Sequence, residues 1–359
     1  MLYKFLYPYH IDFSFLNIFR YITFRTIYGG LTAFLICFLF GPFVIRQLSR
    51  MQVGQIIQKD GPSSHLGKEG TPTMGGILIC ASIFLSTVIW GNPDNHYVNI
   101  LMLALILFWL IGFIDDYLMQ VKKRNMGFTA KGKFMIQVLF GLVISWLIYE
   151  CPDFDSRLTI PFLKGVSPDL GIFYIPFACF VIVGTSNAVN LTDGLDGLAI
   201  GPFIVASATY MFFAYVAGHA QIAQYLHVRH IASAGEISVI CGTLCGAGLG
   251  FLWFNAHPAQ IFMGDSGSIP LGAILGTIAV MTKQEILLVI VGGLFVMEAL
   301  SVIIQVLYFK LTKGKRIFRM APLHHHFELK GWHESKVIIR FWIISITLAL
   351  ISLSTLKIR

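Results

Sequence analysis

Charged residues are scarce in this chain of 359 residues: they make up 12% of it, against 56% hydrophobic residues. Soluble domains carry about 25% charged residues, so the composition excludes an ordinary soluble protein. A helix that crosses a bilayer needs about 20 mostly apolar residues, and stretches of that kind cover most of the chain. The sequence therefore predicts an all-α polytopic integral membrane protein.

Repeats, low-complexity tracts and long linkers are also missing from the sequence. We therefore expect residues 1–359 to form a single integral membrane domain. The N-terminal stretch has no small-residue cleavage site and leads into a full-length apolar span, so it does not resemble a signal peptide. We expect the lipid bilayer to surround the protein, and we expect no nucleic acid among its partners.

The six cysteines contain no C-x-x-C pair. Five of them fall within predicted spans, where cysteine usually behaves as a small apolar residue. Cys241 and Cys245 are one helical turn apart, which is more typical of helix packing than of metal binding. Neither a disulfide framework nor a thiolate metal site is indicated.

Hydropathy predicts about ten membrane spans, and the basic residues orient them. The spans lie near residues 22–45, 75–91, 97–114, 134–150, 172–189, 198–217, 236–254, 267–282, 286–308 and 337–356. Alternate loops differ in charge, with sixteen Lys and Arg in one set and four in the other. Basic loops face the cytoplasm, so the first set is predicted to be cytoplasmic and both termini periplasmic. The basic loops are 46–73, 115–133, 190–197, 255–266 and 309–336.

Five aspartates lie at or near the predicted cytoplasmic ends of spans. Asp115 and Asp116 end the third span, Asp193 and Asp196 lie between the fifth and sixth, and Asp265 precedes the eighth. Helix capping and solvation at the interface would explain any one of them. Five at the same face repel one another unless a cation or proton offsets them. Carboxylates at the membrane boundary are functional candidates, so we expect these five to form a site.

Magnesium is the cation that fits such a site best. Carboxylate oxygens suit a hard ion, and Mg²⁺ usually takes one or two carboxylates together with substrate phosphates. Glycines flank the aspartates in "TDGLDG" and "MGDSGS". They either present backbone N–H groups to phosphate or simply permit tight turns. Together with Asn190, Asn255 and nearby lysines, the pattern favours phosphoryl transfer, which needs mainly positioning and charge neutralisation.

Two polar loops accompany the aspartates. Three consecutive histidines, His324, His325 and His326, follow Arg319 in the last cytoplasmic loop. Histidine can donate to a phosphate or bind a metal, and we favour contact with a substrate phosphate or sugar over a structural role. Successive residues of a helix point in different directions, so at most two of the three could converge on one centre. The other loop, residues 60–76, would by itself be an ordinary solvated loop.

Five motifs resemble the phospho-N-acetylmuramoyl-pentapeptide-transferases, bacterial translocases among the polyprenyl-phosphate N-acetylhexosamine-1-phosphate transferases. They are "GPSSHLGKEGTPTMGG", "GFIDDY", "NAVNLTDGLDGLA", "GFLWFNAHPAQIFMGDSGS" and "RMAPLHHHFELKGW". The resemblance implies ten transmembrane helices, a cytoplasmic active site in the bacterial inner membrane, Mg²⁺ dependence and a homodimer. It also implies transfer of phospho-MurNAc-pentapeptide from UDP-MurNAc-pentapeptide to undecaprenyl phosphate, which gives lipid I and UMP for peptidoglycan synthesis.

The same resemblance implies roles for individual residues. Asp265 would be the principal Mg²⁺ ligand, and Asp115 and Asp116 would serve the lipid phosphate, with Asp115 as the base. His324 would lie beside the diphosphate. The remaining expected substrate contacts are Lys68, Thr73, Lys131, Lys133, Asn190, Asp193, Asp196, Asn255, Phe262, Gly264, His325 and His326. Within this set, Phe262 would stack on uracil. Two departures from the family pattern are Ser266, where valine is expected, and His333, where proline is expected.

Several alternatives remain open from the sequence. A one-step displacement is the simpler path, and an aspartyl-phosphate intermediate is the other. A sister enzyme that uses UDP-N-acetylglucosamine would share the aspartate motifs, although "HHHFELKGW" favours the muramoyl-pentapeptide donor. An ion-coupled transporter would place its substrate site near the bilayer midplane, often between inverted repeats. The position of the aspartates at one face argues against a transporter.

Overall fold

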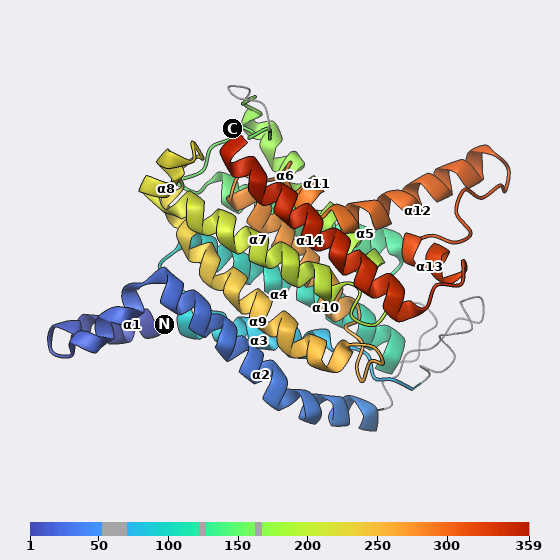
Figure 1. Ribbon diagram of the computed structural model, residues 1–359, viewed down its shortest axis with the longest axis horizontal. Helices are drawn as coiled ribbons and strands as arrows, with labels where there is room; N and C mark the ends of the chain where they lie inside the picture. Colours follow the sequence, from blue (N-terminus) through green and yellow to red (C-terminus); the bar gives the residue numbers. More distant parts are fainter. Residues whose placement is uncertain (52–69, 122–126, 162–166, 359) are drawn as a thin grey trace.

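The structure is a computed structural model that describes residues 1–51, 70–121, 127–161 and 167–358 (Figure 1). Within these ranges the regular structure is helical, apart from isolated bridge residues such as Arg157, which pairs with Asp169. The prediction of an all-α fold is confirmed. The main helices are α2 (Ile22–Arg50), α3 (Gly76–Trp90), α4 (His96–Asp116), α5 (Ala130–Tyr149), α6 (Tyr174–Thr192), α7 (Ile200–Gly218), α9 (Ile237–Asn255), α10 (Asp265–Met281), α12 (Gly293–Leu311) and α14 (Glu334–Ile358).

These helices account for the predicted spans. In the described part of the chain, eight helices are long and apolar enough to cross a membrane, and α3 and α10 are shorter apolar helices. The chain is therefore a polytopic membrane protein. Short helices connect the main ones: α1 (Leu2–Leu6), η1 (Tyr7–Ile11), η2 (Ser14–Arg20), η4 (Tyr117–Val121), η5 (Gly171–Phe173), α8 (Ala220–Tyr225), η6 (Ala232–Glu236), α11 (Leu288–Val291) and α13 (Leu323–Glu328).

The ninth predicted span differs from the expectation because it is interrupted. It consists of α11 and α12, which are separated at Gly292. Gly292 and Gly293 are adjacent, and glycine pairs are common sites of helix kinks because glycine has a low helix propensity. After this break α12 runs outward beyond the other helices (Figure 1). Its later part carries exposed apolar side chains such as Ile303, Leu307 and Leu311.

Helix α10 lies at the centre of the bundle (Figure 1). Every residue from Ser266 to Met281 is buried, as expected for a helix that is apolar or small on all sides. Its closest neighbours are α4 and α6, and it also packs against α3. Because α10 begins at Asp265, the packing of this central helix fixes where that carboxylate lies.

The contact between α4 and the start of α10 depends on the absence of a side chain at Gly112. A Cβ added there would overlap the carbonyl oxygen of Asp265. Small residues allow membrane helices to approach closely and gain van der Waals contact, which is a main source of their association. Gly112 therefore lets the end of α4, with its two aspartates, lie directly against the first turn of α10.

We expect Gly112→Ala to lower the thermal unfolding midpoint of the purified protein, because overpacking a tight contact costs about 1–3 kcal/mol. Gly184→Ala on α6 is the matched control: among the described residues, a Cβ at Gly184 would meet no atom within 4 Å. Alanine is the better helix former by about 1 kcal/mol, so the control should be neutral or stabilising. Equal midpoints for the two variants in a detergent thermal-shift assay would contradict the close contact.

Candidate active site

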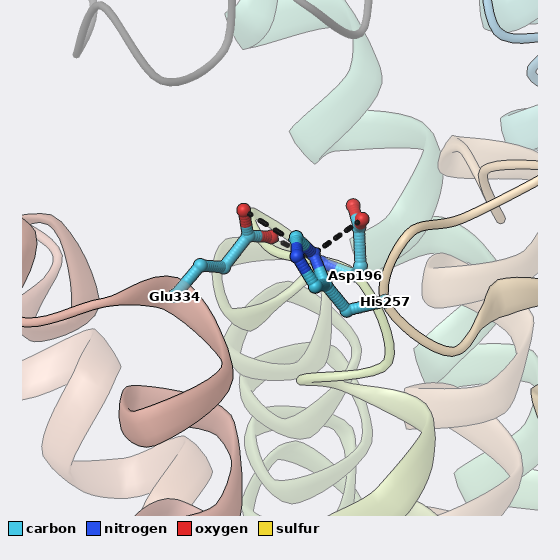
Figure 2. Close-up of side chains that lie close together, drawn as sticks. All are labelled: Asp196, His257 and Glu334. Atoms are coloured by element: carbon cyan, nitrogen blue, oxygen red, sulfur yellow. Dashed lines mark hydrogen bonds and ion pairs between the residues drawn. The ribbon is translucent and has the colours of Figure 1, made fainter.

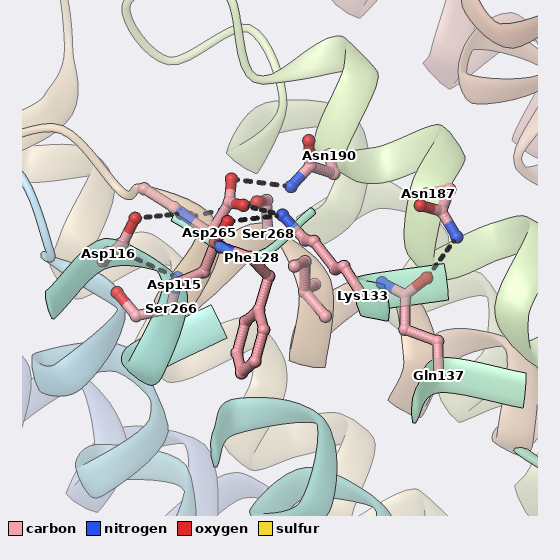
Figure 3. A network of polar contacts seen from close by, with 12 residues as sticks. Asp115, Asp116, Phe128, Lys133, Gln137, Asn187, Asn190, Asp265, Ser266 and Ser268 are labelled. Atoms are coloured by element: carbon pink, nitrogen blue, oxygen red, sulfur yellow. Dashed lines mark hydrogen bonds and ion pairs between the residues drawn. The ribbon is translucent and has the colours of Figure 1, made fainter. Parts of the chain in front are cut away.

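Four helix ends meet at one end of the bundle, and each brings one polar side chain (Figure 3). Asp115 is in the last turn of α4, Lys133 in the first turn of α5, Asn190 in the last turn of α6, and Asp265 at the start of α10. These positions are separated by up to 150 residues in sequence, since Asp115 precedes Asp265 by that number. Four polar side chains that are far apart in the sequence therefore lie together in the structure.

Lys133 connects the two carboxylates of this group. Its Nζ donates a hydrogen bond to Oδ2 of Asp115 at 2.9 Å and another to Oδ2 of Asp265. The second oxygen of each aspartate has its own donor: Phe128 N–H bonds to Asp115 at 2.7 Å, and the Asn190 amide bonds to Asp265 at 2.8 Å. Two acidic groups therefore share one ammonium, and the oxygens that face it form a cation-binding position.

Asp116 has a different environment from its neighbour Asp115. Its two oxygens accept the backbone N–H groups of Asp265 at 3.2 Å and Ser266 at 2.9 Å. The first N–H groups of a helix have no partner within the helix, and the helix dipole favours a negative charge there. The residue before α10, Gly264, makes no side-chain cap. Asp116 therefore caps α10 from a neighbouring helix, which the sequence pattern did not reveal.

The segment before α10 lies against the segment before α3. Gly75 N–H donates to the Phe262 carbonyl at 2.9 Å. Gly264 has a φ of 71°, and a Cβ there would lie 2.7 Å from Oδ2 of Asp116 and 3.0 Å from the hydroxyl of Thr73. Glycine is therefore required at this position, both for its backbone conformation and for space. Thr73 and the half-buried Phe262 are in this way brought next to the start of α10.

Asp193 follows the last residue of α6 and experiences the negative charge of the same cluster. Burial, together with the nearby carboxylates of Asp265 and Asp116, raises the pKa of Asp193 to about 8. Nearby negative charge disfavours the ionised form of an acid. Asp193 is therefore protonated over part of the neutral range unless a cation offsets the charge around it.

Asn255 and Asp196 shape the neighbouring turns. The side-chain Oδ1 of Asn255 accepts the N–H of Gly197 at 3.0 Å, and its Nδ2 donates to the main-chain carbonyl of Ile261 at 2.8 Å. Asp196 Oδ2 accepts the N–H of Ala259 at 3.0 Å. Both side chains are buried, so the segment before α7 and the segment after α9 are joined through these polar contacts.

Asp196 also belongs to an acidic and histidine cluster with His257 and Glu334 (Figure 2). His257 Nδ1 lies 3.2 Å from Asp196 Oδ2 and 3.6 Å from Glu334 Oε2. One ligand atom from each residue lies within 4.8 Å of the others, so the three could hold a metal ion. A histidine with two carboxylates suits a transition metal, whereas the oxygen set around Asp265 and Asp115 suits Mg²⁺.

The three consecutive histidines of α13 point to three different partners. Buried His324 faces Glu298 of α12, with Nδ1 3.4 Å from the carboxylate. His325 Nδ1 lies 2.8 Å from Glu328, and His326 Nδ1 accepts the N–H of Arg319 at 3.0 Å. The expectation that the three could not all converge on one centre agrees with this geometry.

The structure brings some of the expected site residues together and separates others. Direct contacts join Asp115, Lys133, Asn190 and Asp265. Lys131 is exposed in the first turn of α5. Lys68 lies outside the described residues. The sequence reading missed three further acidic or basic residues, which are Glu298, Glu334 and His257. Glu298 had a usable signal, because it is the sole charged residue in the predicted span 286–308.

Comparison with known proteins identifies the family. The model for glycosyl transferase family 4 matches residues 98–283, and the phospho-N-acetylmuramoyl-pentapeptide-transferase signature 1 matches residues 68–80. The chain is 76% identical over 359 residues to the phospho-N-acetylmuramoyl-pentapeptide-transferase of Desulforapulum autotrophicum, with 100% of both chains covered. The chain belongs to the phospho-N-acetylmuramoyl-pentapeptide-transferase family. Enzymes of the same name from Desulfosudis oleivorans and Desulfotalea psychrophila are 62% and 55% identical, each over 100% of both chains.

The family resemblance predicted from the motifs is confirmed, and the matched segments cover most of the site. Residues 98–283 include Asp115, Lys133, Asn190 and Asp265, so the helix ends that meet in Figure 3 all lie within the family model. The signature at residues 68–80 includes Thr73, which lies beside Gly264. As a phosphoglycosyl transferase, a member of this family acts on phosphorylated substrates, and clustered cation-binding groups fit that chemistry.

We expect Asp193→Asn to flatten the pH dependence of stability in the metal-free protein. The folded-state pKa of about 8 exceeds the ordinary pKa of an aspartate, 3.8, so between these pH values the folded state keeps a proton that the unfolded chain has lost. Stability attributable to Asp193 therefore falls as pH rises through that window. The measurement is the unfolding midpoint from pH 5 to pH 9 with chelator present. Parallel curves for the variant and the unaltered protein would contradict the raised pKa.

Proposed function

We propose that the protein transfers phospho-MurNAc-pentapeptide from UDP-MurNAc-pentapeptide to undecaprenyl phosphate. The products are undecaprenyl-diphospho-MurNAc-pentapeptide (lipid I) and UMP. The identity of 76% over the whole chain to a phospho-N-acetylmuramoyl-pentapeptide-transferase carries this proposal. The meeting of Asp115, Asp265, Lys133 and Asn190 at one end of the bundle supports it, because phosphoryl transfer needs positioned cations between anionic reactants.

The acidic residues have distinct roles in this proposal. Asp265 is the principal ligand of Mg²⁺, which supplies charge neutralisation between the phosphates when it is bound. Asp115, whose oxygens face Lys133 and the N–H of Phe128, is the base that takes the residual proton from the lipid phosphate. Asp116 holds the first turn of α10 in place through two backbone hydrogen bonds. Lys133 and Asn190 orient the Asp265 carboxylate.

The nucleotide occupies the neighbouring turns in this proposal. Phe262 stacks on uracil, and Asp193, Asp196 and Asn255 form the walls of the pocket. Two observations support this arrangement. The ring of Phe262 is half-buried next to the start of α10, and the buried Asn255 side chain hydrogen-bonds to the two neighbouring segments. The other substrate contacts are assigned to the phosphates and the sugar: Lys68, Thr73, Lys131, Gly264, His324, His325 and His326.

The proposed location is the bacterial inner membrane, with the site at the cytoplasmic face and both termini in the periplasm. The imbalance of sixteen basic residues against four between alternate loops supports this orientation. A site at this face can meet a water-soluble nucleotide and a lipid phosphate at the same time. We also propose that the chain acts as one domain, and as a homodimer in the membrane.

The experiment is an assay of UMP release by the purified protein with UDP-MurNAc-pentapeptide and undecaprenyl phosphate. We expect release with Mg²⁺ and little release with chelator, and we expect UDP-N-acetylglucosamine to be a poor donor. Absence of UMP release from the muramoyl-pentapeptide donor would overturn the proposed activity. Undiminished release under thorough chelation would overturn the Mg²⁺ dependence alone.

We expect Asp265→Asn and Asp115→Asn each to lower the turnover number by about 100-fold or more, because each removes a charge that acts on the reacting phosphates. Asp94→Asn is the control: Asp94 precedes α4 at its other end and pairs with Lys4 on the surface. Exposed ion pairs contribute little to stability, so this variant should keep full turnover. A site variant with near-normal turnover would contradict its role.

The chemical path is tested separately. We expect a one-step displacement, because Asp115 is hydrogen-bonded to both Lys133 and a backbone N–H. An oxygen of Asp115 would have to leave these donors to form a bond to phosphorus, whereas it can take up a proton from a neighbouring phosphate at hydrogen-bonding distance. Single-turnover reaction with donor labelled in the transferred phosphate, followed by acid quench, should leave no label on the protein. A labelled Asp115 or Asp116 would instead establish an aspartyl-phosphate intermediate.

A further inference from the structure

Glu298 is a carboxylate in the interior of the helical bundle that the proposed reaction does not use. It lies in the second turn of α12, and none of its surface is exposed. A buried charge is costly unless polar groups surround it. Acidic residues within membrane-spanning segments usually have a functional reason to be there. The contacts of Glu298 therefore indicate what this carboxylate does.

Among the described residues, the polar partners of the Glu298 carboxylate are the first two residues of α13. The N–H of Leu323 donates to Oε2 at 2.7 Å, and the N–H of His324 donates to Oε1 at 3.2 Å. The imidazole of His324 turns back to the same oxygen, with Nδ1 at 3.4 Å from Oε1. One carboxylate thus accepts a hydrogen bond from the backbone of His324 and also faces its imidazole ring.

The other edge of the His324 ring faces the turn after α6. A Cβ added at Gly194 would overlap Nε2 of His324, so the ring lies directly against the backbone of this turn. Asp193, the residue before Gly194, is adjacent to the acidic cluster that includes Asp265. The imidazole therefore lies between Glu298 on one side and the edge of the candidate active site on the other.

The His324 ring is polar, almost fully buried and incompletely hydrogen-bonded. It is 1% exposed, and neither of its nitrogens makes a hydrogen bond with a described residue that meets normal geometry. Hydrogen bonds of catalytic groups are often long without substrate and shorten when it binds. Burial lowers the pKa of His324, while the carboxylate of Glu298 opposes that effect. The ring is therefore neutral near pH 7, and one nitrogen carries the proton.

We propose that Glu298 is the positioning residue for His324, and that it holds the proton on Nδ1 so that Nε2 is the nitrogen presented to the substrate. The carboxylate accepts hydrogen bonds only, so Nδ1 must be the donor when the two are in contact. The partner of one ring nitrogen decides which nitrogen is left for chemistry. The charged and titratable groups near the ring are Glu298 on α12, His325 and Glu328 on α13, and Asp193 on the α6–α7 turn.

This inference rests on the proposed function for its kinetic consequence, but the Glu298–His324 contact can be measured without it. We expect Glu298→Gln to lower kcat by about 10- to 100-fold, the usual loss when a group that orients an active-site histidine is removed. The KM for the nucleotide donor should change little, because the substrate contacts themselves remain. Glu298→Asp, which keeps the carboxylate, should recover part of the lost kcat.

Glu285→Gln is the matched control. Glu285 is also a buried carboxylate, and it pairs with Lys283 at 3.1 Å and with Tyr174 near the other end of α10. Both substitutions remove one buried negative charge, so both should lower the unfolding midpoint. Only Glu298→Gln should lower kcat if Glu298 acts through His324. An equal loss of kcat in both variants would show a general effect of stability and overturn the proposal.

The direct readout is the ¹⁵N spectrum of histidine-labelled protein, with the His324 signals assigned by comparison with His324→Asn. We expect a protonated Nδ1 and an unprotonated Nε2 in the unaltered protein, and loss of that preference in Glu298→Gln. An Nε2-protonated His324 in the unaltered protein would overturn the proposal, as would full kcat in Glu298→Gln. If the unaltered protein releases no UMP, the proposed function fails, while the spectra still decide the Glu298 contact.

Discussion

The mutual repulsion of carboxylates is the constraint on which the site end of the bundle depends. Asp115, Asp116, Asp193 and Asp265 come from three helix ends, and each would push the others apart. Two unit charges 4 Å apart interact by about 4 kcal/mol at an effective dielectric constant of 20. The ammonium of Lys133, the amide of Asn190 and the first N–H groups of α10 offset this repulsion. The helix ends can therefore pack together at this site only because these donors neutralise the aspartates.

This arrangement also gives the site its chemical capacity. The ammonium and amide groups that neutralise the carboxylates without substrate can also bind phosphate oxygens when substrate is present. The protein holds them in fixed helices around α10, which is buried from Ser266 to Met281, so little reorganisation is needed when charge develops in the reaction. The family assignment and the geometry of the helix ends thus lead to the same kind of chemistry.

The sequence predicted the parts of this structure that depend on composition and local pattern. Apolar stretches gave the spans, and the recurrence of aspartate at one face indicated that Asp115 and Asp265 would meet. The break at Gly292 was not predicted, because membrane helices often tolerate glycine without interruption. The division of labour between Asp115 and Asp116 was not predictable either. Adjacent residues on a helix differ by about 100° in direction, and only the tertiary contacts decide which one faces α10.

The cap that Asp116 provides has a consequence for how freely this sequence can vary. Its partners are main-chain N–H groups, so any residue other than proline at positions 265 and 266 can supply them. The backbone part of this anchor between α4 and α10 is accordingly independent of the side chain at position 266, where the family pattern led us to expect valine, although the buried Ser266 hydroxyl adds a hydrogen bond of its own to Asp116. A substitution at position 266 therefore leaves the two backbone N–H donors in place, whereas position 116 must keep its carboxylate to accept them.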